Sequence, residues 1–268
     1  QPMKHFLIAI VLAFSFLKSH AQVGNLSMFC ESISWQISSI TALNTIPQLG
    51  ITSQVQQIGP GSLANRTLLF AETQKGNNGF GVNYYGDFFD MTFQHALQGH
   101  YSRKLQLNDD MSLAFGTSLG AYLYQGTFGT ITEREGYGIY QVATAIKYKN
   151  LLVAYSLGRK AWRNVGFSQN IYATHRVKLS QDFFLDPLFH LFWVTQQPYL
   201  QTGLRLSWKD WVDVGLIYQS ENGTNLTFGL NLFKNIRLGY AVVGLNPNLF
   251  TQYSQEFLII WRPGSSKG

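Results

Sequence analysis

The second half of the chain alternates apolar and polar residues with a period of two, in runs separated by short turns. Before the dipeptide Lys209-Asp210, one face would carry Leu200, Thr202, Leu204, Leu206 and Trp208, and the other Gln201, Gly203, Arg205 and Ser207. After it, the alternation resumes over residues 212–218 and 225–232. Successive side chains of a β-strand point to opposite sides. Each run therefore predicts a strand with one apolar face and one polar or glycine-rich face.

This pattern, repeated strand after strand, is the one that a transmembrane β-barrel requires. Composition favours the same interpretation: aromatic residues make up 15% of the chain and charged residues only 13%, where roughly 25% charged residues is usual. With no long apolar run to form spanning helices, we predict one all-β, transmembrane antiparallel β-barrel over residues 49–262. The expected number of strands is about fourteen, within a range of twelve to sixteen.

The predicted turns alternate in length, as they do in outer-membrane barrels with short periplasmic turns and longer outer loops. The short turns are Asn108-Asp109-Asp110, Lys149-Asn150, Ser180-Gln181-Asp182, Lys209-Asp210 and Lys234-Asn235. The opposite connections are Gln125–Tyr137, Arg159–Ser168, Ser220–Gly223 and Gly244–Thr251, of which the first is the longest and the third is itself short. Both chain ends and the short turns are therefore expected on the periplasmic side.

The N-terminal residues predict secretion. After Gln1-Pro2 and Met3, a basic Lys4 precedes an apolar run over residues 6–17 and a small-residue site at 19–21. We interpret residues 1–21 as a signal peptide with cleavage near Ala21/Gln22. Residues 22–48 would form a periplasmic or plug segment, and residues 263–268 a tail. Cys30, the only cysteine, cannot form an internal disulfide.

Charged residues on the predicted polar face are the first place to look for function. They are Lys147, Arg176, Lys178, Arg205, Asp213, Arg237 and Glu256. Two interpretations remain open: the charges pair across the lumen and fix the strand register, or they line a selective pore. The net charge of +6 forms no basic stripe, so contact with anionic lipid headgroups is expected and nucleic acid is not.

Other chemistry is sparse. His100 and Ser102 would share a strand face, but no Asp or Glu lies beside them to orient the histidine. We predict no enzymatic activity, no catalytic residues, no cofactor and no metal site. Aromatic residues near predicted strand ends are Tyr148, Trp193, Tyr199, Trp208, Trp211, Tyr218, Tyr253 and Trp261. Interfacial girdles explain them, with a carbohydrate-binding platform as the alternative.

Several blocks resemble the PorP/SprF family of outer-membrane barrels of the type IX secretion system of Bacteroidetes. They are residues 79–82 after a glycine-rich turn, the pair 96–105 and 111–120, residues 236–241, and residues 255–258 in the terminal strand. The resemblance covers about Gly50 to Trp261. Residues 25–29 and 43–45 match the family's N-terminal pattern only loosely.

The resemblance implies a barrel in the Gram-negative outer membrane that has an accessory or docking role in type IX protein secretion or gliding. It would help to deliver or anchor a secreted surface protein. The implied partners are outer-membrane lipid, periplasmic secretion proteins and a secreted cargo or adhesin. The alternative function is a small-solute outer-membrane channel or transporter.

Overall fold

A computed structural model describes residues 33, 36–44, 46–57, 63–89, 92–128, 131–159, 167–194, 197–220, 223–233, 235–244 and 254–263. The predicted signal peptide, Cys30 and Tyr253 lie outside these residues, as do positions 264–268 of the predicted tail. No helix among the described residues has the length and apolar character to cross a membrane.

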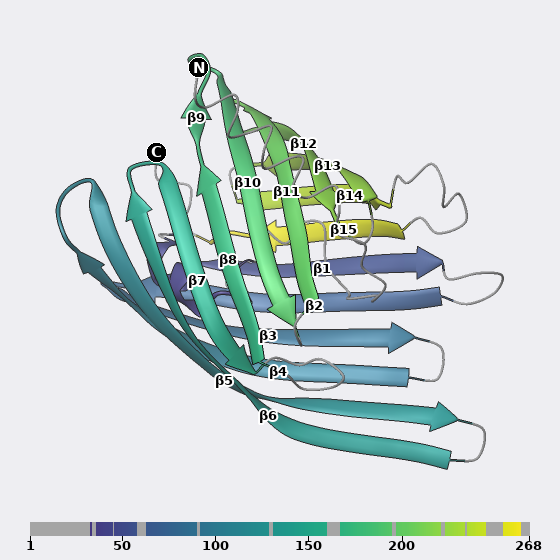
Figure 1. The fold of residues 1–268 in the computed structure, drawn as a ribbon. Coiled ribbons are helices and arrows are strands. Elements are labelled where there is room, and N and C mark those ends of the chain that lie inside the picture. The colour runs from purple at the N-terminus through teal and green to yellow at the C-terminus, as the bar shows by residue number, and fades with distance from the viewer. Residues whose placement is uncertain are drawn as a thin grey trace.

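The described residues are almost entirely strands (Figure 1). The strands are β1 (Gln48–Gln57), β2 (Leu63–Lys75), β3 (Asn78–Phe89), β4 (Thr92–Gln106), β5 (Met111–Phe128), β6 (Ile131–Tyr148), β7 (Leu151–Arg159), β8 (Phe167–His175), β9 (Val177–Lys178), β10 (Phe183–Val194), β11 (Gln197–Trp208), β12 (Val212–Gln219), β13 (Gly223–Leu232), β14 (Ile236–Val243) and β15 (Ser254–Trp261). Each pairs antiparallel with its neighbours, and β1 pairs with β15, so the sheet closes on itself.

The barrel has 14 strands, which confirms the predicted architecture. The segments β8 and β9 both pair with β10 in one continuous register, from Leu188↔Thr174 to Leu185↔Val177. They form a single strand that is interrupted opposite Pro187. Since proline has no backbone N–H, the ladder loses a hydrogen bond at this point.

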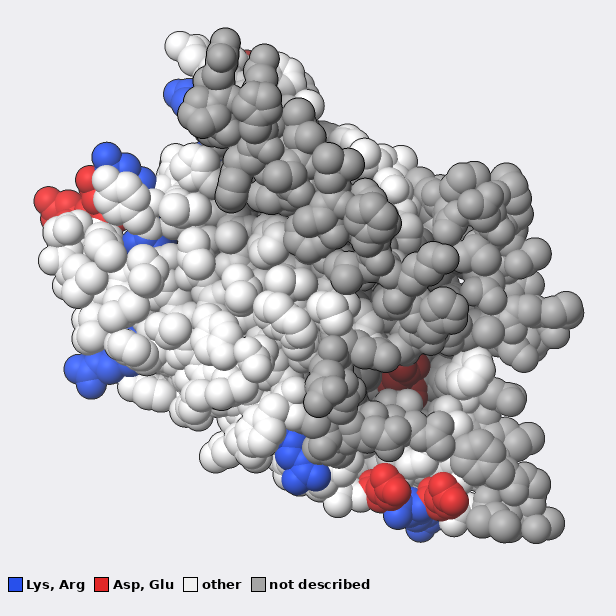
Figure 2. All heavy atoms as spheres, in the orientation of Figure 1, with Lys and Arg blue, Asp and Glu red and all other residues white. Residues whose placement is uncertain are grey.

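The predicted facing of the strands is confirmed around the turn at Lys209-Asp210. The exception is Leu200, which was predicted on the apolar outer face but is 3% exposed. Leu204, Leu206 and Trp208 are exposed on the outside, while Ser207 is buried on the inside. The same alternation continues in β12, where Val214 and Leu216 are exposed and Asp213 and Ile217 are buried. Figure 2 shows that the charged side chains visible on one face gather toward its ends, with a broad uncharged surface between them. Many of the exposed side chains are large and apolar, as on the band that a barrel presents to lipid.

The predicted tight turns at residues 108–110, 149–150, 180–182 and 209–210 are present, and Lys234 of the fifth turn lies outside the described residues. At the turn after β11, Lys209 and Asp210 have φ angles of 50° and 56°, the left-handed geometry that joins twisted antiparallel strands through two residues. These turns lie at the end of the barrel where β1 begins and β15 finishes. The predicted alternation of short turns with longer loops is wrong, because the connections between β3 and β4, between β5 and β6, and between β10 and β11 have two residues each and lie at the opposite end.

The predicted long loop Gln125–Tyr137 is wrong. Strand pairing between β5 and β6 continues to Phe128↔Ile131, so nearly all of this region is strand. The sequence misled because Thr132, Glu133, Arg134 and Glu135 are all exposed and offer no apolar alternation. A hairpin that is solvated on both faces lacks the signal by which a half-buried strand is recognised.

A short 3-10 helix, η3 (Ser38–Leu43), lies inside the barrel. All six of its residues are buried, and it packs against β2 to β7. Its apolar residues join small residues of the wall in one cluster, which comprises Ile33, Ile37, Ile40, Ala42, Leu43, Ala114, Ala143, Ala145, Ala154 and Tyr172. We call residues 36–44 the plug segment.

Candidate functional site

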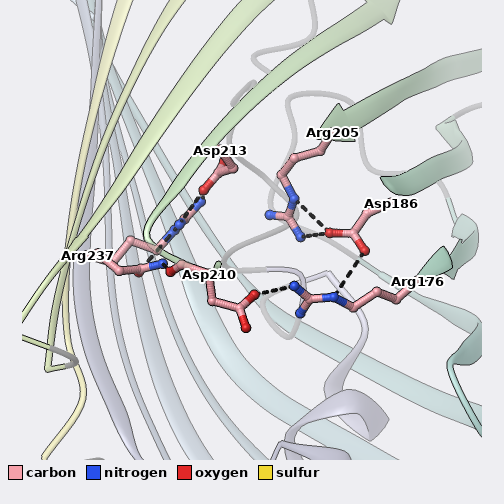
Figure 3. A network of polar contacts seen from close by, with 7 residues as sticks. Arg176, Asp186, Arg205, Asp210, Asp213 and Arg237 are labelled. Carbon is pink, nitrogen blue, oxygen red and sulfur yellow. Dashed lines mark hydrogen bonds and ion pairs between the residues drawn. The ribbon is translucent and has the colours of Figure 1, made fainter. Parts of the chain in front are cut away.

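The interior of the barrel is the candidate site, and several of its inward charges form ion pairs. Arg237 on β14 donates two hydrogen bonds to Asp213 on β12, Nη1 to Oδ2 at 2.7 Å and Nη2 to Oδ1 at 3.1 Å. Both side chains are about 95% buried, with 5% and 6% exposed. A fork of two parallel bonds is a strong and directional arginine–carboxylate contact. Figure 3 shows this pair at the wall of β12 to β14.

A glycine makes room for this pair. Gly229 lies between the two strands, directly opposite Asp213, and a Cβ atom at position 229 would lie 2.4 Å from Asp213 Oδ2 and 2.6 Å from Arg237 Nη2. Any side chain at this position would push the ion pair apart. Position 229 is therefore fitted to its two charged neighbours.

A second group of charges lies on β8 to β11, near the end with the short turns (Figure 3). Arg205 donates from Nε and Nη2 to Asp186 Oδ2 at 3.3 and 3.2 Å. Arg176 Nε lies 3.8 Å from the other oxygen of Asp186, and Nη2 of Arg176 contacts Asp210 in the turn. Arg176 also stacks on Phe184, 4.4 Å from the ring centroid. These contacts tie three strands and one turn together.

These contacts decide between the two interpretations of the inward charges at the residues they involve. Arg176, Arg205, Asp213 and Arg237 all form ion pairs between strands, so they fix register and do not form a ring of open charge. Glu256 is fully buried, whereas Lys147 and Lys178 are exposed near the short turns.

Sequence reasoning missed three residues of the interior ion pairs, Asp186, Arg66 and Asp87. Asp186 was not recognised as an inward residue, because β10 contains Pro187 and apolar residues on both faces and so lacks a clear apolar–polar alternation. Arg66 and Asp87 form another interior ion pair, Nε to Oδ2 at 3.1 Å. They lie in the first half of the chain, where the strand faces are less clearly segregated. An inward charge on a strand of a barrel is itself the signal that would have found them.

Aromatic and aliphatic residues cross the interior between β2–β6 and β14–β15. The buried cluster comprises Leu68, Phe70, Tyr85, Ala96, Tyr122, Tyr124, Ile139, Ala241, Val243, Leu258 and Ile260. The hydroxyls of two of its tyrosines are satisfied: Tyr85 donates to Asp87 at 3.2 Å and Tyr122 to Gln94 at 2.9 Å. This part of the interior is a packed core and not a wet channel.

The plug segment is held by main-chain contacts. Gln141 accepts the N–H of Ser38 at 3.1 Å and donates to the carbonyl of Gln36, and Ser156 donates to the same carbonyl at 3.1 Å. On the other side, Gln74 donates to the carbonyl of Ala42 at 2.9 Å. Side chains of the wall thereby satisfy backbone groups that would otherwise be buried without partners.

The backbone of the plug segment packs directly against two glycines of the strands. A Cβ atom at Gly116 would lie 2.5 Å from the nitrogen of Ser39, and one at Gly79 would lie 2.5 Å from the nitrogen of Ala42. Both distances are too short for any side chain. The wall and the plug segment are therefore complementary in shape.

This complementarity predicts that Gly116→Val displaces the plug segment. Overpacking costs about 1–3 kcal/mol, so the equilibrium for plug opening should shift roughly 5- to 150-fold. Thiol labelling of a Thr41→Cys reporter in a Cys30→Ser background measures this shift, because Thr41 is buried in the parent protein. The control is Gly99→Val, since a Cβ there has nothing within 4 Å. Equal labelling rates in the two variants would contradict the plug.

The possible Ser–His pair does not assemble in the structure. His100 and Ser102 are both buried and face inward, but His100 Nδ1 contacts Asn83 at 3.2 Å, and Ser102 Oγ has no hydrogen-bond partner. No carboxylate hydrogen-bonds to His100 among the described residues. The arrangement lacks the geometry of an activated nucleophile.

The aromatic residues divide between interface and interior. Tyr148, Trp208, Trp211, Tyr218 and Trp261 are exposed at strand ends, as expected for interfacial girdles. The prediction is wrong for Tyr199, which is 3% exposed and stacks on Phe192 at 4.9 Å between ring centroids. It is odd-numbered on β11, so it shares the inner face with Gln201 and Gly203.

Sequence comparison decides the family. The sequence pattern of the family described as type IX secretion system membrane protein PorP/SprF matches residues 48–248. The chain belongs to the PorP/SprF family. This confirms the resemblance inferred from the strand blocks, and the matched region covers β1 to β14 of the barrel. A search of curated protein sequences finds no match.

Solved structures confirm the type of fold. The toluene transporter TodX of Pseudomonas putida has a TM-score of 0.52 at 9% identity, with 90% of this chain and 93% of that chain covered. The outer membrane protein Omp33 of Acinetobacter baumannii has a TM-score of 0.55 at 9% identity, with 82% and 99% covered. A FadL homologue of Pseudomonas aeruginosa has a TM-score of 0.53 at 10% identity, with 85% and 93% covered. At these identities the likeness concerns the barrel alone.

Proposed function

We propose that this PorP/SprF protein is a non-enzymatic docking or accessory component of type IX secretion or the linked gliding apparatus, helping to deliver or anchor a secreted surface protein. One observation carries the proposal: the described interior is occupied by the plug segment, a packed aromatic cluster and paired charges. Such a barrel offers surfaces to partners and little room for a solute.

Its surfaces suggest how partners divide between the two ends. The apolar band contacts outer-membrane lipid, and residues 1–21 act as the signal peptide, removed near Ala21/Gln22. Residues 22–48 and the short turns would meet periplasmic secretion proteins. The opposite end would meet the cargo or adhesin. In this arrangement the barrel is a fixed anchor between partners on the two sides of the membrane.

The rival function, a small-solute channel, makes a different prediction for the Asp213–Arg237 pair. If docking is right, replacing both residues with Asp213→Leu and Arg237→Met should leave surface display of the cargo within about twofold of the parent, because the pair is structural. Deletion of the gene should abolish display. Surface proteomics of intact cells measures both effects.

A conductance measurement tests the channel alternative directly. The purified parent protein should show no stable ion-selective current in planar bilayers. A reproducible current that shifts when the Asp213–Arg237 pair is removed would establish the channel and refute docking as the main role, since lumen charges set the field that an ion meets.

The proposed topology places the end of the barrel with the Lys209-Asp210 turn in the periplasm and the tip of the β5–β6 hairpin outside. In a Cys30→Ser background, an impermeant thiol reagent on intact cells should therefore label Thr132→Cys but not Asp210→Cys. Both positions are exposed, so accessibility within the folded barrel does not limit either reaction. Labelling of position 210 alone would invert the topology.

A further inference from the structure

The β5–β6 hairpin extends past the strand that follows it. Both strands are 18 residues long, whereas β7 has 9 residues. Pairing between β6 and β7 begins at Tyr140↔Arg159, while pairing between β5 and β6 continues outward to Phe128↔Ile131. Among the described residues, positions 131–139 of β6 therefore pair on one side only. Figure 1 shows this edge at the lower right, with no ribbon strand beyond it.

The direction of each main-chain group on this edge follows from the ladder. Lys149 donates its N–H to the carbonyl of Asp110 at 2.8 Å, and hydrogen-bonding directions alternate from residue to residue along an antiparallel strand. Odd-numbered residues of β6 therefore bond to β5, and even-numbered residues point away from it. At the outer part of the edge these are Thr132 and Arg134, each of which presents an N–H and a carbonyl to the free side.

The connection after β7 is too short to cover the whole edge. It has seven residues, 160–166, and must return to Phe167, which pairs directly with Arg159. At about 3.3–3.6 Å per extended residue, a chain of this length that goes out and back reaches about 14 Å. The edge from position 139 to position 131 spans about 27 Å. Thr132 and Arg134 lie beyond that reach.

The side chains of the edge have a distinct charge pattern. Glu133 and Glu135 are exposed and share the inner face with Tyr137, over which Arg159 lies at 4.8 Å from the ring centroid. Figure 2 shows acidic and basic side chains close together at the lower right, where Figure 1 places this hairpin. An added strand would place side chains directly opposite the two glutamates at alternate positions, where opposite charges are favourable.

A hollow of about 620 Å³ lies against the same hairpin. It is lined by Phe93, His95, Leu123, Tyr124, Gln125, Arg134, Glu135 and Gly136. Because Gly136 has no side chain, a long side chain on the outer face of an added strand can lean across it toward the hollow. The hollow would hold one bulky residue of the partner.

We propose that residues 131–139 of β6 bind an extended segment of the secreted partner, which adds to the sheet as a strand and carries Lys or Arg at alternate positions. Main-chain hydrogen bonds give such strand addition its affinity, and alternate side chains give it specificity. The proposal rests on the docking function and names its site. A second copy of this chain is a poorer occupant, because two-fold pairing centred on Arg134 places Glu133 opposite Glu135.

Peptide binding to the full-length protein in lipid nanodiscs tests the site. The probe is a fluorescent nonapeptide, Thr-Lys-Val-Lys-Thr-Lys-Val-Lys-Thr, and the comparison peptides replace Lys with Glu or carry N-methyl groups on alternate residues. We expect the Lys peptide to bind at least tenfold more tightly than either comparison peptide. The double variant Glu133→Lys with Glu135→Lys should reverse the preference between the Lys and Glu peptides. Equal binding of the N-methylated peptide would overturn strand addition.

A matched pair of variants separates the contribution of main-chain hydrogen bonds to peptide binding from that of the Arg134 side chain. Arg134→Pro removes an outward N–H and leaves the bonds to β5 in place, so binding should fall at least tenfold. Arg134→Ala keeps the N–H and should bind within about twofold of the parent. Thr132→Pro repeats the test at the second outward N–H. Parent-like binding by both proline variants would refute the site, as would a dimer that the peptide dissociates, because the occupant would then be a second copy.

Measuring cargo display on cells distinguishes failure of the proposed strand-addition site from failure of the docking function. If gene deletion abolishes cargo display and Arg134→Pro also reduces it at least tenfold, the site is supported. If deletion abolishes display but both proline variants display normally, docking stands and the edge is not its site. If deletion leaves display unchanged, the docking function itself is wrong.

Discussion

Asp213→Ala is expected to destabilise the barrel by about 3–5 kcal/mol, since it leaves a buried cation without its counter-charge. Arg237 is 4% exposed and donates two hydrogen bonds to this carboxylate. Removing Asp213 removes both charge-assisted bonds and leaves Arg237 with a longer contact to Asn231, at 3.5 Å. Unfolding in urea, followed by loss of the heat-modifiable band on gels, measures the change in free energy.

The corresponding double substitution should recover most of that loss. In Asp213→Leu with Arg237→Met neither charge remains, and buried ion pairs replaced by apolar residues of similar volume are often neutral or stabilising. The control is Asp110→Ala, because the Lys149–Asp110 pair at 3.5 Å is more than half exposed on both sides and should contribute less than about 1 kcal/mol. If Asp213→Ala is as mild as Asp110→Ala, the interior is wetter than its packing indicates.

Leu204→Arg should cost about 2–4 kcal/mol if the outer face of β11 lies near the bilayer midplane. Leu204 is 52% exposed on the outside of the barrel, midway along β11. An arginine there must enter hydrocarbon or reach along the wall toward the interface. Leu230→Arg should cost less, because Leu230 lies opposite Val212, close to the short turns, and the penalty falls toward the interfaces.

The control for this experiment is a residue of equal exposure outside the membrane band. Leu107 is 53% exposed but lies in the turn between β4 and β5, so Leu107→Arg should be nearly neutral. Equilibrium folding into lipid vesicles measures all three variants. If Leu204→Arg and Leu107→Arg behave alike, the proposed lipid-facing surface is wrong.

The sequence by itself determined the barrel, the facing of its strands and the positions of its tight turns. These features follow from local rules: alternate side chains point to opposite sides, and lipid accepts only apolar residues over a band of fixed height. Val214 and Leu216 therefore identify the outside and Asp213 the inside without any knowledge of neighbouring strands. The resemblance to PorP/SprF proteins was readable for the same reason, since its blocks are strand patterns in a fixed order.

Only the tertiary structure decided which inward groups meet. Asp213 contacts Arg237 across 24 positions, and Arg205 contacts Asp186 across 19, because strand register and barrel closure bring them together. The plug segment is a further case: the need for Gly79 and Gly116 arises from a backbone that lies far away in sequence. The one-sided pairing of β6 among the described residues could not be predicted either, because its exposed, charged residues follow no burial pattern and because it depends on where β7 ends. Contacts between distant strands are set by closure of the whole sheet, and no local pattern encodes them.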